Sequence, residues 1–396
     1  MNVAVGSARR RAVRRSVPEP EEWKLIRATV GQILETEAPS AAVREWDATC
    51  TYPAHLFEIL AGQGFTAMPF RAENGGADAG PAEMVVVAEE LGRRGMDIAA
   101  GFGISVFLGL MIEAHGTREQ RDTLLPGVLR AQQRLALSMT EPGAGSDAGA
   151  ITTTARLEGD AYVISGQKVF TTGANLPNTT LVVSARDRSS SPASRGISLF
   201  LVPTSTAGVA VNRLDTVGRH ILGTNEVFLD NVRVPRTALI GPSGEGWAVL
   251  REGMTLERLF TCGAYIGGFE TVIDMVLDYG SQREQFGRSI GEFQAISHPI
   301  ADMYADLEAA RLLTYSAARA VAQGEDARTL VSVAKLFVTE SYQRATNHAM
   351  QVFGGYSYMN EFDVHRFWKD ARIGTVSAGT SQVHREIICR ALGLRP

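Results

Sequence analysis

The spacing of hydrophobic residues divides the chain into a helical part, a strand-rich part and a second helical part. Between residues 19 and 132 apolar side chains recur every three or four positions, which is the period of a buried helix face. Between residues 135 and 241 the period becomes two, as in half-buried strands, and after residue 244 the helical period returns in long segments. The pattern predicts helices, then a β-barrel or sandwich, then a bundle of long antiparallel helices.

Individual elements follow from this pattern and from the residues that end them. Thr117 followed by Gln120 predicts a capping box at the start of one helix, and the polar, Ser- and Arg-rich segment 186–195 is expected to be a loop. The predicted helices, beside one around Trp23 and one that Thr117 begins, cover 53–60, 84–91, 98–114, 246–279, 293–322, 330–352, 360–371 and 381–392, and the predicted strands cover 135–140, 151–157, 161–166, 181–184, 197–203, 209–211 and 226–235.

The stretch 135–147 changes from a strand to a glycine-rich loop. Leu137 and Met139 share one face of the expected strand, and Pro142 with the glycines after it breaks the strand. Glycines allow the backbone to approach a bulky ligand, so the loop suits a cofactor, although an ordinary surface turn explains the same residues. Residues 143–148 match G-x-G-x-x-A, but the β-branched run 151–154 stands where a dinucleotide-binding fold needs a helix. We therefore reject that fold.

Composition and charge exclude several classes of function. A net charge of −4 without a basic block in the body of the chain does not favour nucleic acid. The three cysteines lie far apart, which predicts a reducing cytoplasm and no disulfide framework, and the seven histidines show no metal-ligand spacing. The most apolar run, 98–112, is too short to span a bilayer. Residues 1–15 contain five arginines and no acid, as in a transit peptide or a disordered tail.

Eight segments of the chain form a recognisable set. They are M-T-E-P-G-A-G-S-D (139–147), G-Q-K-V-F-T-T-G (166–173), F-L-D-N-V-R-V-P (228–235), L-E-R (256–258), R-E-Q-F-G (283–287), F-Q-A-I (293–296), Q-V-F-G-G (351–355) and A-G-T-S-Q (378–382). In this order they resemble the acyl-CoA dehydrogenase family over about residues 23–394. The resemblance implies FAD-dependent α,β-dehydrogenation of an acyl thioester by a homotetramer. After a disordered basic tail expected at 1–18, it implies an α-helical domain (19–132), a middle β domain (133–241) and a C-terminal four-helix bundle (242–396).

The resemblance implies two sets of residues that bind FAD. One set lies in the middle domain, where Phe170 stands at a position that is often Trp in the family and forms an aromatic wall, and Thr172 donates a hydrogen bond to the flavin. The other set contacts the FAD of a neighbouring subunit, and Arg283 supplies a cation for its pyrophosphate. The first set is Leu137, Met139, Thr140, Ser146, Phe170 and Thr172; the second is Arg283, Gln285, Phe293, Gln294, Gln351, Gly354 and Gly355, with Thr380 and Gln382 at the adenosine half.

The chain departs from a common family pattern at the catalytic base. Removal of the α-proton of a thioester needs a carboxylate, which many members carry immediately before G-T, and this chain has Ala378 there. Glu257 matches the position that the isovaleryl-CoA and long-chain subgroups use instead. It lies in a mostly apolar helical turn, and its presence coincides with the loss of the carboxylate at Ala378. The resemblance therefore implies that Glu257 is the base and that the enzyme belongs to this subgroup.

Other residues are assigned to the substrate. The backbone N–H of Ala378, next to Gly379, polarises the thioester carbonyl in the family, and a backbone donor survives the change from Glu to Ala. Arg258 matches a family position that contacts the thioester tail. Ser146, in the glycine-rich loop, matches a position near the phosphates or the thioester tail. Thr255 replaces an Asp that often contacts the pantetheine, so a substrate on a carrier protein is an alternative to CoA.

Three functions remain open at this point. The first is an acyl-CoA dehydrogenase, with short or branched acyl groups favoured by the base position and an electron-transfer flavoprotein as electron acceptor. The second is a biosynthetic desaturase of an acyl- or aminoacyl-carrier-protein thioester. The third is a flavoprotein without dehydrogenase activity, namely an oxidase, a monooxygenase or a DNA-associated member, and the mildly acidic chain ranks the DNA-associated form low.

Overall fold

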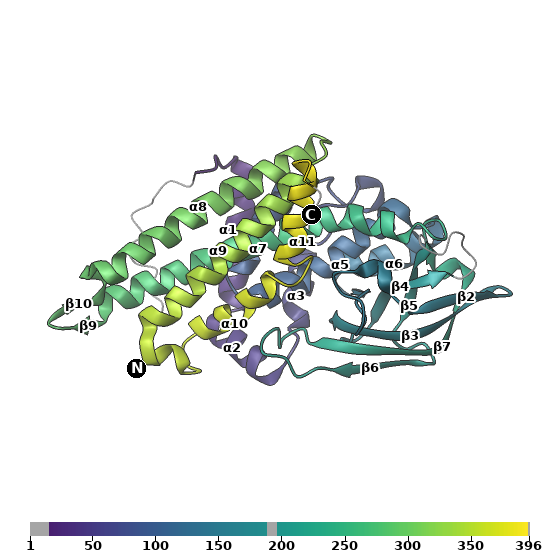
Figure 1. Ribbon diagram of the computed structural model, residues 1–396, viewed down its shortest axis with the longest axis horizontal. Helices are drawn as coiled ribbons and strands as arrows, with labels where there is room; N and C mark the ends of the chain where they lie inside the picture. The colour runs from purple at the N-terminus through teal and green to yellow at the C-terminus, as the bar shows by residue number, and fades with distance from the viewer. Residues whose placement is uncertain (1–15, 188–195, 395–396) are drawn as a thin grey trace. The chain divides into compact units, whose positions relative to one another are not determined.

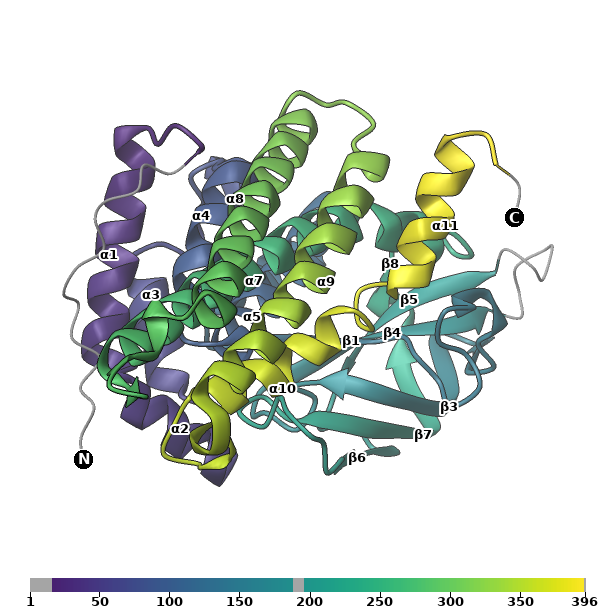
Figure 2. The same ribbon diagram turned by 60° about the vertical axis from the view of Figure 1, so that its left-hand side comes forward.

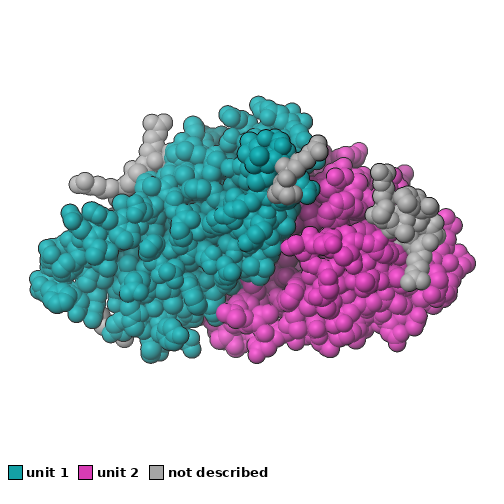
Figure 3. Space-filling model, in the orientation of Figure 1, with its two compact units in different colours: residues 1–35, 81–99, 258–396 teal, residues 36–80, 100–257 magenta. Residues whose placement is uncertain are grey.

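The computed structural model describes residues 16–187 and 196–394 (Figure 1). They form two compact units, each built from separate stretches of sequence (Figure 3). Unit 1 comprises Met1–Glu35, Pro81–Ala99 and Arg258–Pro396, and unit 2 comprises Thr36–Gly80 and Ala100–Glu257. The helices before the sheet are divided between the units, and the three consecutive domain ranges stay a prediction.

Unit 2 is organised around one eight-stranded sheet. The strands run in the order β6-β7-β3-β2-β4-β5-β8, and β1 pairs in parallel with β4. The predicted hairpin is β2 and β3, which turn at Gly159 with a positive φ. Arg186, expected in a loop, belongs to β4, and 188–195 lie outside the described residues. The strands are β1 (Arg134–Ser138), β2 (Thr154–Glu158), β3 (Ala161–Thr172), β4 (Thr179–Asp187), β5 (Ile197–Pro203), β6 (Val209–Arg213), β7 (Thr224–Pro235) and β8 (Leu239–Ile240).

Helices precede the sheet in the sequence, as predicted. The capping box of α6 (Arg118–Leu129) is confirmed, because Thr117 accepts from Gln120 N at 3.2 Å and Gln120 accepts from Thr117 N at 2.9 Å. The same Gln120 side chain donates to the carbonyls of Thr237 and Leu239 and so joins α6 to β8. The other helices here are α2 (Ser40–Thr49), α3 (Ala54–Gly62) and α5 (Met96–His115).

Unit 1 is a set of long helices packed at close range (Figures 1 and 2). Its backbone contacts require glycine: a Cβ at Gly267 of α7 would stand 1.8 Å from the carbonyl oxygen of Glu89 on α4. The helices are α1 (Glu21–Glu37), α4 (Pro81–Gly92), α7 (Gly246–Gln282), α8 (Gln294–Ala322), α9 (Arg328–Phe353), α10 (Val364–Gly374) and α11 (Ser381–Ala391), with a short hairpin of β9 (Glu284–Gln285) and β10 (Arg288–Ser289). The first part of α7, up to Glu257, belongs to unit 2.

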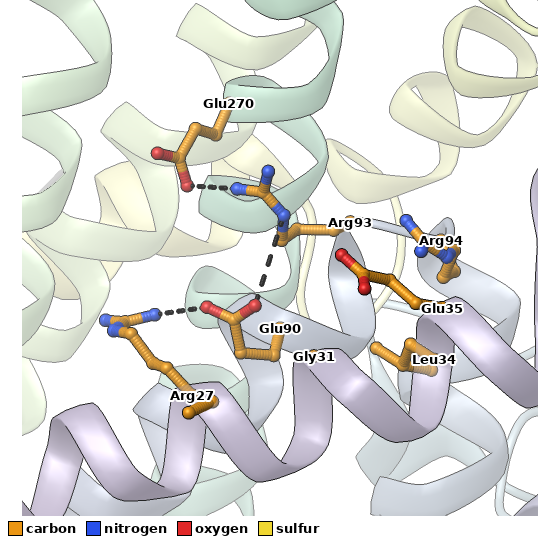
Figure 4. A pocket seen from close by; sticks show the side chains of 9 residues that line it. Arg27, Gly31, Leu34, Glu35, Glu90, Arg93, Arg94 and Glu270 are labelled. Atoms are coloured by element: carbon orange, nitrogen blue, oxygen red, sulfur yellow. Dashed lines mark hydrogen bonds and ion pairs between the residues drawn. The ribbon is translucent and has the colours of Figure 1, made fainter. Parts of the chain in front are cut away.

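A cluster of buried ion pairs joins α1, α4 and α7 within unit 1 (Figure 4). Arg27 lies 2.8 Å from Glu90 and 2.9 Å from Glu89, and Arg93 lies 2.7 Å from Glu270. Arg27, Glu90, Arg93 and Glu270 line a cavity of about 430 Å³. Because these four side chains pair with one another, we interpret the cluster as structural.

Two helices are long and apolar enough to cross a membrane by length and composition alone. They are α5, which is longer than the apolar run seen in the sequence, and α7. In their most apolar windows 67% and 83% of the residues are buried inside the protein, as expected for core helices.

Candidate active site

Within the unit 2 sheet, the structure brings most of the first set of flavin-binding candidates together along the edge of β1 that faces β3. The hydroxyls of Ser138 on β1 and Thr171 on β3 lie 3.0 Å apart, and Val169 N donates to the carbonyl of Thr140 at 2.9 Å. These bonds place the segment containing Leu137, Met139 and Thr140 against the segment containing Phe170 and Thr172. All of these side chains except Phe170 are half-buried. A strand edge of this kind is the surface that the sequence predicted for the flavin.

Phe170 is presented to the surface by a bulge in β3. The pairing of β3 with β7 shifts between Lys168 and Thr171, and Phe170 has a φ of 60°. An aromatic residue in this left-handed region is strained, so neighbouring contacts must impose the conformation. The side chain is 62% exposed, and the alternative interpretation of Phe170 as a core residue is wrong. The ring is available as a wall for a planar ligand.

A buried ion pair behind this edge was not predicted from the sequence. The Lys168 ammonium donates to Glu141 Oε1 at 2.8 Å and to the carbonyl of Met139 at 3.1 Å. Glu141 also accepts from the backbone N–H groups of Thr152 and Thr153 at 2.6 and 3.0 Å. Burial alone would raise the pKa of Glu141, but these hydrogen bonds outweigh it and lower the pKa to about 2. The pair ties the loop after β1 to β3.

The loop after β1 is a tight turn. Glu141 and Ala144 exchange two backbone hydrogen bonds of 3.0 and 3.1 Å, and Ser146 is exposed just beyond them. A Cβ at Gly143 or Gly145 would have open space around it, so the backbone can be approached by a ligand. The loop leads through a short 3-10 turn into β2, so the rejection of a dinucleotide-binding helix is confirmed.

The second set of candidates surrounds a separate cavity in unit 1. The cavity has a volume of about 660 Å³ and is mostly apolar, with Arg283, Gln285, Phe293, Gly354 and Gly355 in its wall. Gln294 and Gln351 are exposed residues that follow or precede wall residues in sequence. The structure therefore gathers most of this set, although its members come from the β9–β10 hairpin, the start of α8 and the end of α9.

The residues in this cavity combine aromatic surfaces with one cation. The guanidinium of Arg283 lies 5.8 Å from the ring centre of Tyr356, and the rings of Tyr279 and Phe353 stack at 4.3 Å. Aromatic walls beside one guanidinium provide for an adenine ring and for an anionic diphosphate. Gly354 and Gly355 leave open space where side chains would otherwise stand.

The loop between α10 and α11 contains the proposed thioester-polarising group. Ala378 and Gly379 both have positive φ, of 53° and 91°. Lys335 of α9 donates to the carbonyls of Ser377 and Gly379 at 2.8 and 2.6 Å, and Arg258 Nε donates to the carbonyl of Ala378 at 3.1 Å. Arg258, expected to contact the thioester tail, thus also holds this loop. Lys335 was not predicted from the sequence.

The residues that follow the loop begin α11. Thr380 caps the helix by accepting from Val383 N at 3.2 Å, and Gln382 is exposed in the first turn. His384 is fully buried beneath the loop, where a Cβ on Gly379 would meet its Nε2 at 3.2 Å. Burial, then the charges of Lys335 and Arg258, lower the pKa of His384 to about 3. The imidazole is therefore neutral at physiological pH.

We expect His384 to make the enzyme sensitive to mild acid. The unfolded chain takes up a proton at His384 below about pH 6.5, whereas the folded protein does so only near pH 3. Stability is complete above pH 6.5 and falls with decreasing pH by up to about 1.4 kcal/mol per unit from this group. Urea unfolding of wild type and His384→Gln at pH 6.5, 5.5 and 4.5 measures the difference in slope. Parallel pH dependences of the two proteins would contradict this assignment.

Glu257 lies on α7, half-buried, with Thr255 one half-turn before it. Both belong to unit 2, whereas Arg258, Ala378 and Gly379 belong to unit 1. The role of Glu257 opposite Ala378 stays a prediction. Among the residues that the structure describes, no group of three or more His, Cys, Asp and Glu could hold a metal ion.

The two buried lysines could have been found from one feature of the sequence. Only 4 of the 39 basic residues are lysines, so the chain uses arginine almost everywhere. Lys168 and Lys335 are both fully buried. Lys168 donates to one backbone carbonyl and to the Glu141 carboxylate, and Lys335 donates to two backbone carbonyls. A compact ammonium fits such a cage, whereas a planar guanidinium does not.

Family models of acyl-CoA dehydrogenases match three successive parts of the chain: the N-terminal domain over residues 20–132, the middle domain over 136–232 and the C-terminal domain over 244–393. A 3-(aryl)acrylate reductase of Clostridium sporogenes is 34% identical and covers 94% of this chain and 98% of its own. The crystal structure of acyl-CoA dehydrogenase from Geobacillus kaustophilus is 32% identical, with a TM-score of 0.90 over 96% of this chain and 100% of that chain. The chain belongs to the acyl-CoA dehydrogenase family.

Membership of the acyl-CoA dehydrogenase family confirms the fold class and makes the protein an FAD-dependent enzyme. A solved FAD complex of PigA is 25% identical, with a TM-score of 0.90 over 96% of this chain and 100% of that chain. The enzyme is an oxidoreductase of the acyl-CoA dehydrogenase family. The relatives include reductases and dehydrogenases, so its subgroup stays a prediction.

Proposed function

We propose that this enzyme dehydrogenates an acyl thioester at the α and β carbons, with Glu257 as the base. The bound FAD supplies the hydride acceptor for the β-hydrogen. The Glu257 carboxylate takes the α-proton, and the N–H of Ala378 donates a hydrogen bond to the thioester carbonyl oxygen. That hydrogen bond acidifies the α-carbon, because it stabilises the negative charge that develops on the oxygen as the proton leaves.

The observation that carries this proposal is the loop at Ala378. Its carbonyls at positions 377, 378 and 379 are all occupied by the cations Lys335 and Arg258. A loop whose carbonyls are bound on one side is suited to present its N–H groups on another. The side chain at 378 is only a methyl group, so the carboxylate must come from elsewhere, and Glu257 is the carboxylate that the family pattern provides.

The acyl group is proposed to be short or branched. The position of Glu257 resembles that in the isovaleryl-CoA and long-chain subgroups, and an isovaleryl-CoA dehydrogenase of Pongo abelii is 30% identical over 94% of this chain. A carrier-protein thioester is the alternative, because Thr255 stands where an Asp often meets the pantetheine of CoA. Thr255 is half-buried on α7, so either carrier would contact a neutral side chain there.

We further propose that the enzyme works as a homotetramer. The unit 1 cavity would receive the cofactor of a neighbouring subunit. This would explain why Phe286, in the wall of this apolar cavity, is 93% exposed in the single chain. An electron-transfer flavoprotein is the proposed electron acceptor. A relative from Acetobacterium woodii, 31% identical, is named as subunit CarC of a caffeyl-CoA reductase–Etf complex.

Anaerobic flavin reduction tests the function. The purified FAD enzyme is mixed with propionyl-, butyryl-, isovaleryl-, palmitoyl- and 3-phenylpropionyl-CoA and with the same acyl groups on a carrier protein, and flavin absorbance is followed. We expect bleaching by a short or branched acyl-CoA. Bleaching by carrier-bound acyl groups alone would favour the alternative. If no thioester bleaches the flavin and enoyl thioesters do not reoxidise chemically reduced enzyme, the proposed dehydrogenation is wrong.

A further inference from the structure

Lys335 donates to two carbonyls of the loop that contains the proposed thioester-polarising group. It lies on α9 and is fully buried, and its ammonium stands 2.8 Å from the oxygen of Ser377 and 2.6 Å from that of Gly379. The carbonyl between them, on Ala378, accepts from Arg258 at 3.1 Å. Three successive carbonyls are therefore bound by two cations, all within unit 1.

The first of these bonds acts directly on the proposed donor. The carbonyl of Ser377 and the N–H of Ala378 belong to the same planar peptide group, and they point in opposite directions. Fixing the oxygen at one end therefore fixes the direction of the N–H at the other end. A cation on the oxygen also draws electron density from the nitrogen, which makes the N–H a stronger donor.

The backbone of this loop needs such support. Ala378 adopts a φ of 53°, a strained conformation for a non-glycine residue that persists only where surrounding contacts impose it. Lys335 and Arg258 provide these contacts on both sides of Ala378. Without the ammonium, the peptide between Ser377 and Ala378 would be free to rotate, and its N–H would lose its direction.

We propose that Lys335 is a positioning residue that orients and polarises the Ala378 N–H toward the thioester carbonyl. This inference rests on the proposed function, in which that N–H is the donor. Lys335 itself does not touch the substrate. A residue that only linked α9 to the loop would affect folding alone. Loss of Lys335, in contrast, should change the polarisation of the bound thioester carbonyl even in protein that is folded and holds flavin.

The absorption of a conjugated thioester reports on that carbonyl. 3-Phenylacryloyl-CoA bound to the FAD enzyme is expected to absorb at longer wavelength than in water, because a hydrogen bond to its carbonyl favours the polarised excited state. In Lys335→Met, at least half of this red shift is expected to disappear. The rate of flavin reduction by substrate should fall about 10–100-fold, below the about 10²–10³-fold cost of losing an oxyanion donor outright, with a smaller change in KM.

Two control variants separate orientation from general damage. Lys24→Met removes an exposed lysine that pairs with Glu21 on α1, and it should leave shift and rate unchanged. Thr339→Val removes a buried hydroxyl that donates to the Lys335 carbonyl at 2.8 Å, and it disturbs the same helix without touching the loop. It should lower stability while the red shift stays at the wild-type value.

The outcomes distinguish this inference from the proposed function. If wild type binds the probe without a red shift, the thioester-polarising role of Ala378 fails and the inference fails with it. If wild type does not bind this probe, the enoyl thioester of the best acyl group in the panel replaces it, and the absence of a red shift there has the same meaning. If wild type shows the shift and flavin-loaded Lys335→Met keeps it, only the positioning role is overturned. Should Lys335→Met not hold flavin, Lys335→Gln is measured instead, and loss of flavin in both variants would also overturn the inference, because the lysine would then serve folding.

Discussion

Glu257→Gln should reduce flavin with acyl thioester about 10²–10⁴-fold more slowly than wild type, which is the usual contribution of a general base. Gln has nearly the same shape as Glu but cannot accept a proton from carbon. Binding of FAD should be unchanged, because the residues proposed to hold it lie along β1 and β3 and in the wall of the unit 1 cavity, and in the described part of the chain residue 257 is not part of that wall. The measurement is stopped-flow bleaching of the flavin without oxygen, with the best thioester of the substrate panel.

Glu252→Gln is the matched control for this prediction. Glu252 lies on the same helix, five residues earlier, and its exposed carboxylate pairs with His115 at 2.8 Å. The same chemical change there should leave the rate within a factor of about two, because an exposed pair contributes less than about 1 kcal/mol. Bleaching of Glu257→Gln at the wild-type rate would sink the assignment of the base.

A second variant tests whether positions 257 and 378 are alternatives. Many relatives of this family carry the base immediately before G-T, where this chain has Ala378. The double variant Glu257→Gln/Ala378→Glu should recover part of the lost rate, because a carboxylate returns to the thioester by the other route. Recovery should remain incomplete, since a Glu must then adopt the positive φ of residue 378.

The elements that the sequence predicted well are those with local causes. The capping box at Thr117 and the turn at Gly159 need residues only a few positions apart, and both formed as expected. The strand 135–140 was recognised by its period, but Ser138, expected on the face opposite Leu137, is the fully buried residue that meets Thr171. Alternation assigns residues to two faces of a strand, but it does not show which face is more deeply buried.

The parts of the site that the sequence did not reveal depend on distant partners. Lys168 and Glu141 are 27 residues apart, and Lys335 is 42 residues from Ser377. Neither distance is a repeat of a helix or strand, so hydrophobic periodicity carries no trace of these contacts. The bulge that exposes Phe170 arises from the register of β3 against β7, which is likewise set by a strand more than 50 residues away.

Lys168→Met should destabilise the enzyme by about 3–5 kcal/mol, the cost of removing one partner of a buried ion pair. Met fills most of the space of the lysine side chain, so the loss is mainly electrostatic. Glu141 would keep its bonds from Thr152 and Thr153 but would lose the ammonium that offsets its burial. Its pKa should then rise from about 2 toward 4.5, so that the variant should be less stable at neutral pH and should lose less further stability on acidification.

The sign follows from the carboxyl group. In wild type the unfolded chain protonates Glu141 near pH 4.5 and the folded protein only near pH 2, so its contribution is complete above pH 4.5 and is lost as pH falls toward 2. In Lys168→Met the loss should still begin near pH 4.5, where the unfolded chain protonates, but it should be smaller and end at a higher pH, because the pKa of the folded protein is then closer to 4.5. Thermal unfolding at fixed FAD concentration, between pH 7 and pH 3, measures both the stability lost at neutral pH and the further loss on acidification.

A double-mutant cycle decides whether the effect belongs to the pair. Glu141→Gln leaves Lys168 as a buried cation, and burial already lowers the pKa of this lysine to about 8, so the charge is then released more easily. The double variant Lys168→Met/Glu141→Gln should lose less stability than the sum of the single variants, because it leaves no buried charge without its partner.

The affinity for FAD is a second, separate readout. The loop carrying Met139 and Thr140 would still lose the Lys168 bond to the Met139 carbonyl, so FAD affinity should fall in Lys168→Met and stay low in the double variant. Two results would contradict this account. Additive stability losses would show that the two side chains do not act as a pair, and normal FAD affinity in the double variant would show that the Lys168 bond does not hold the loop.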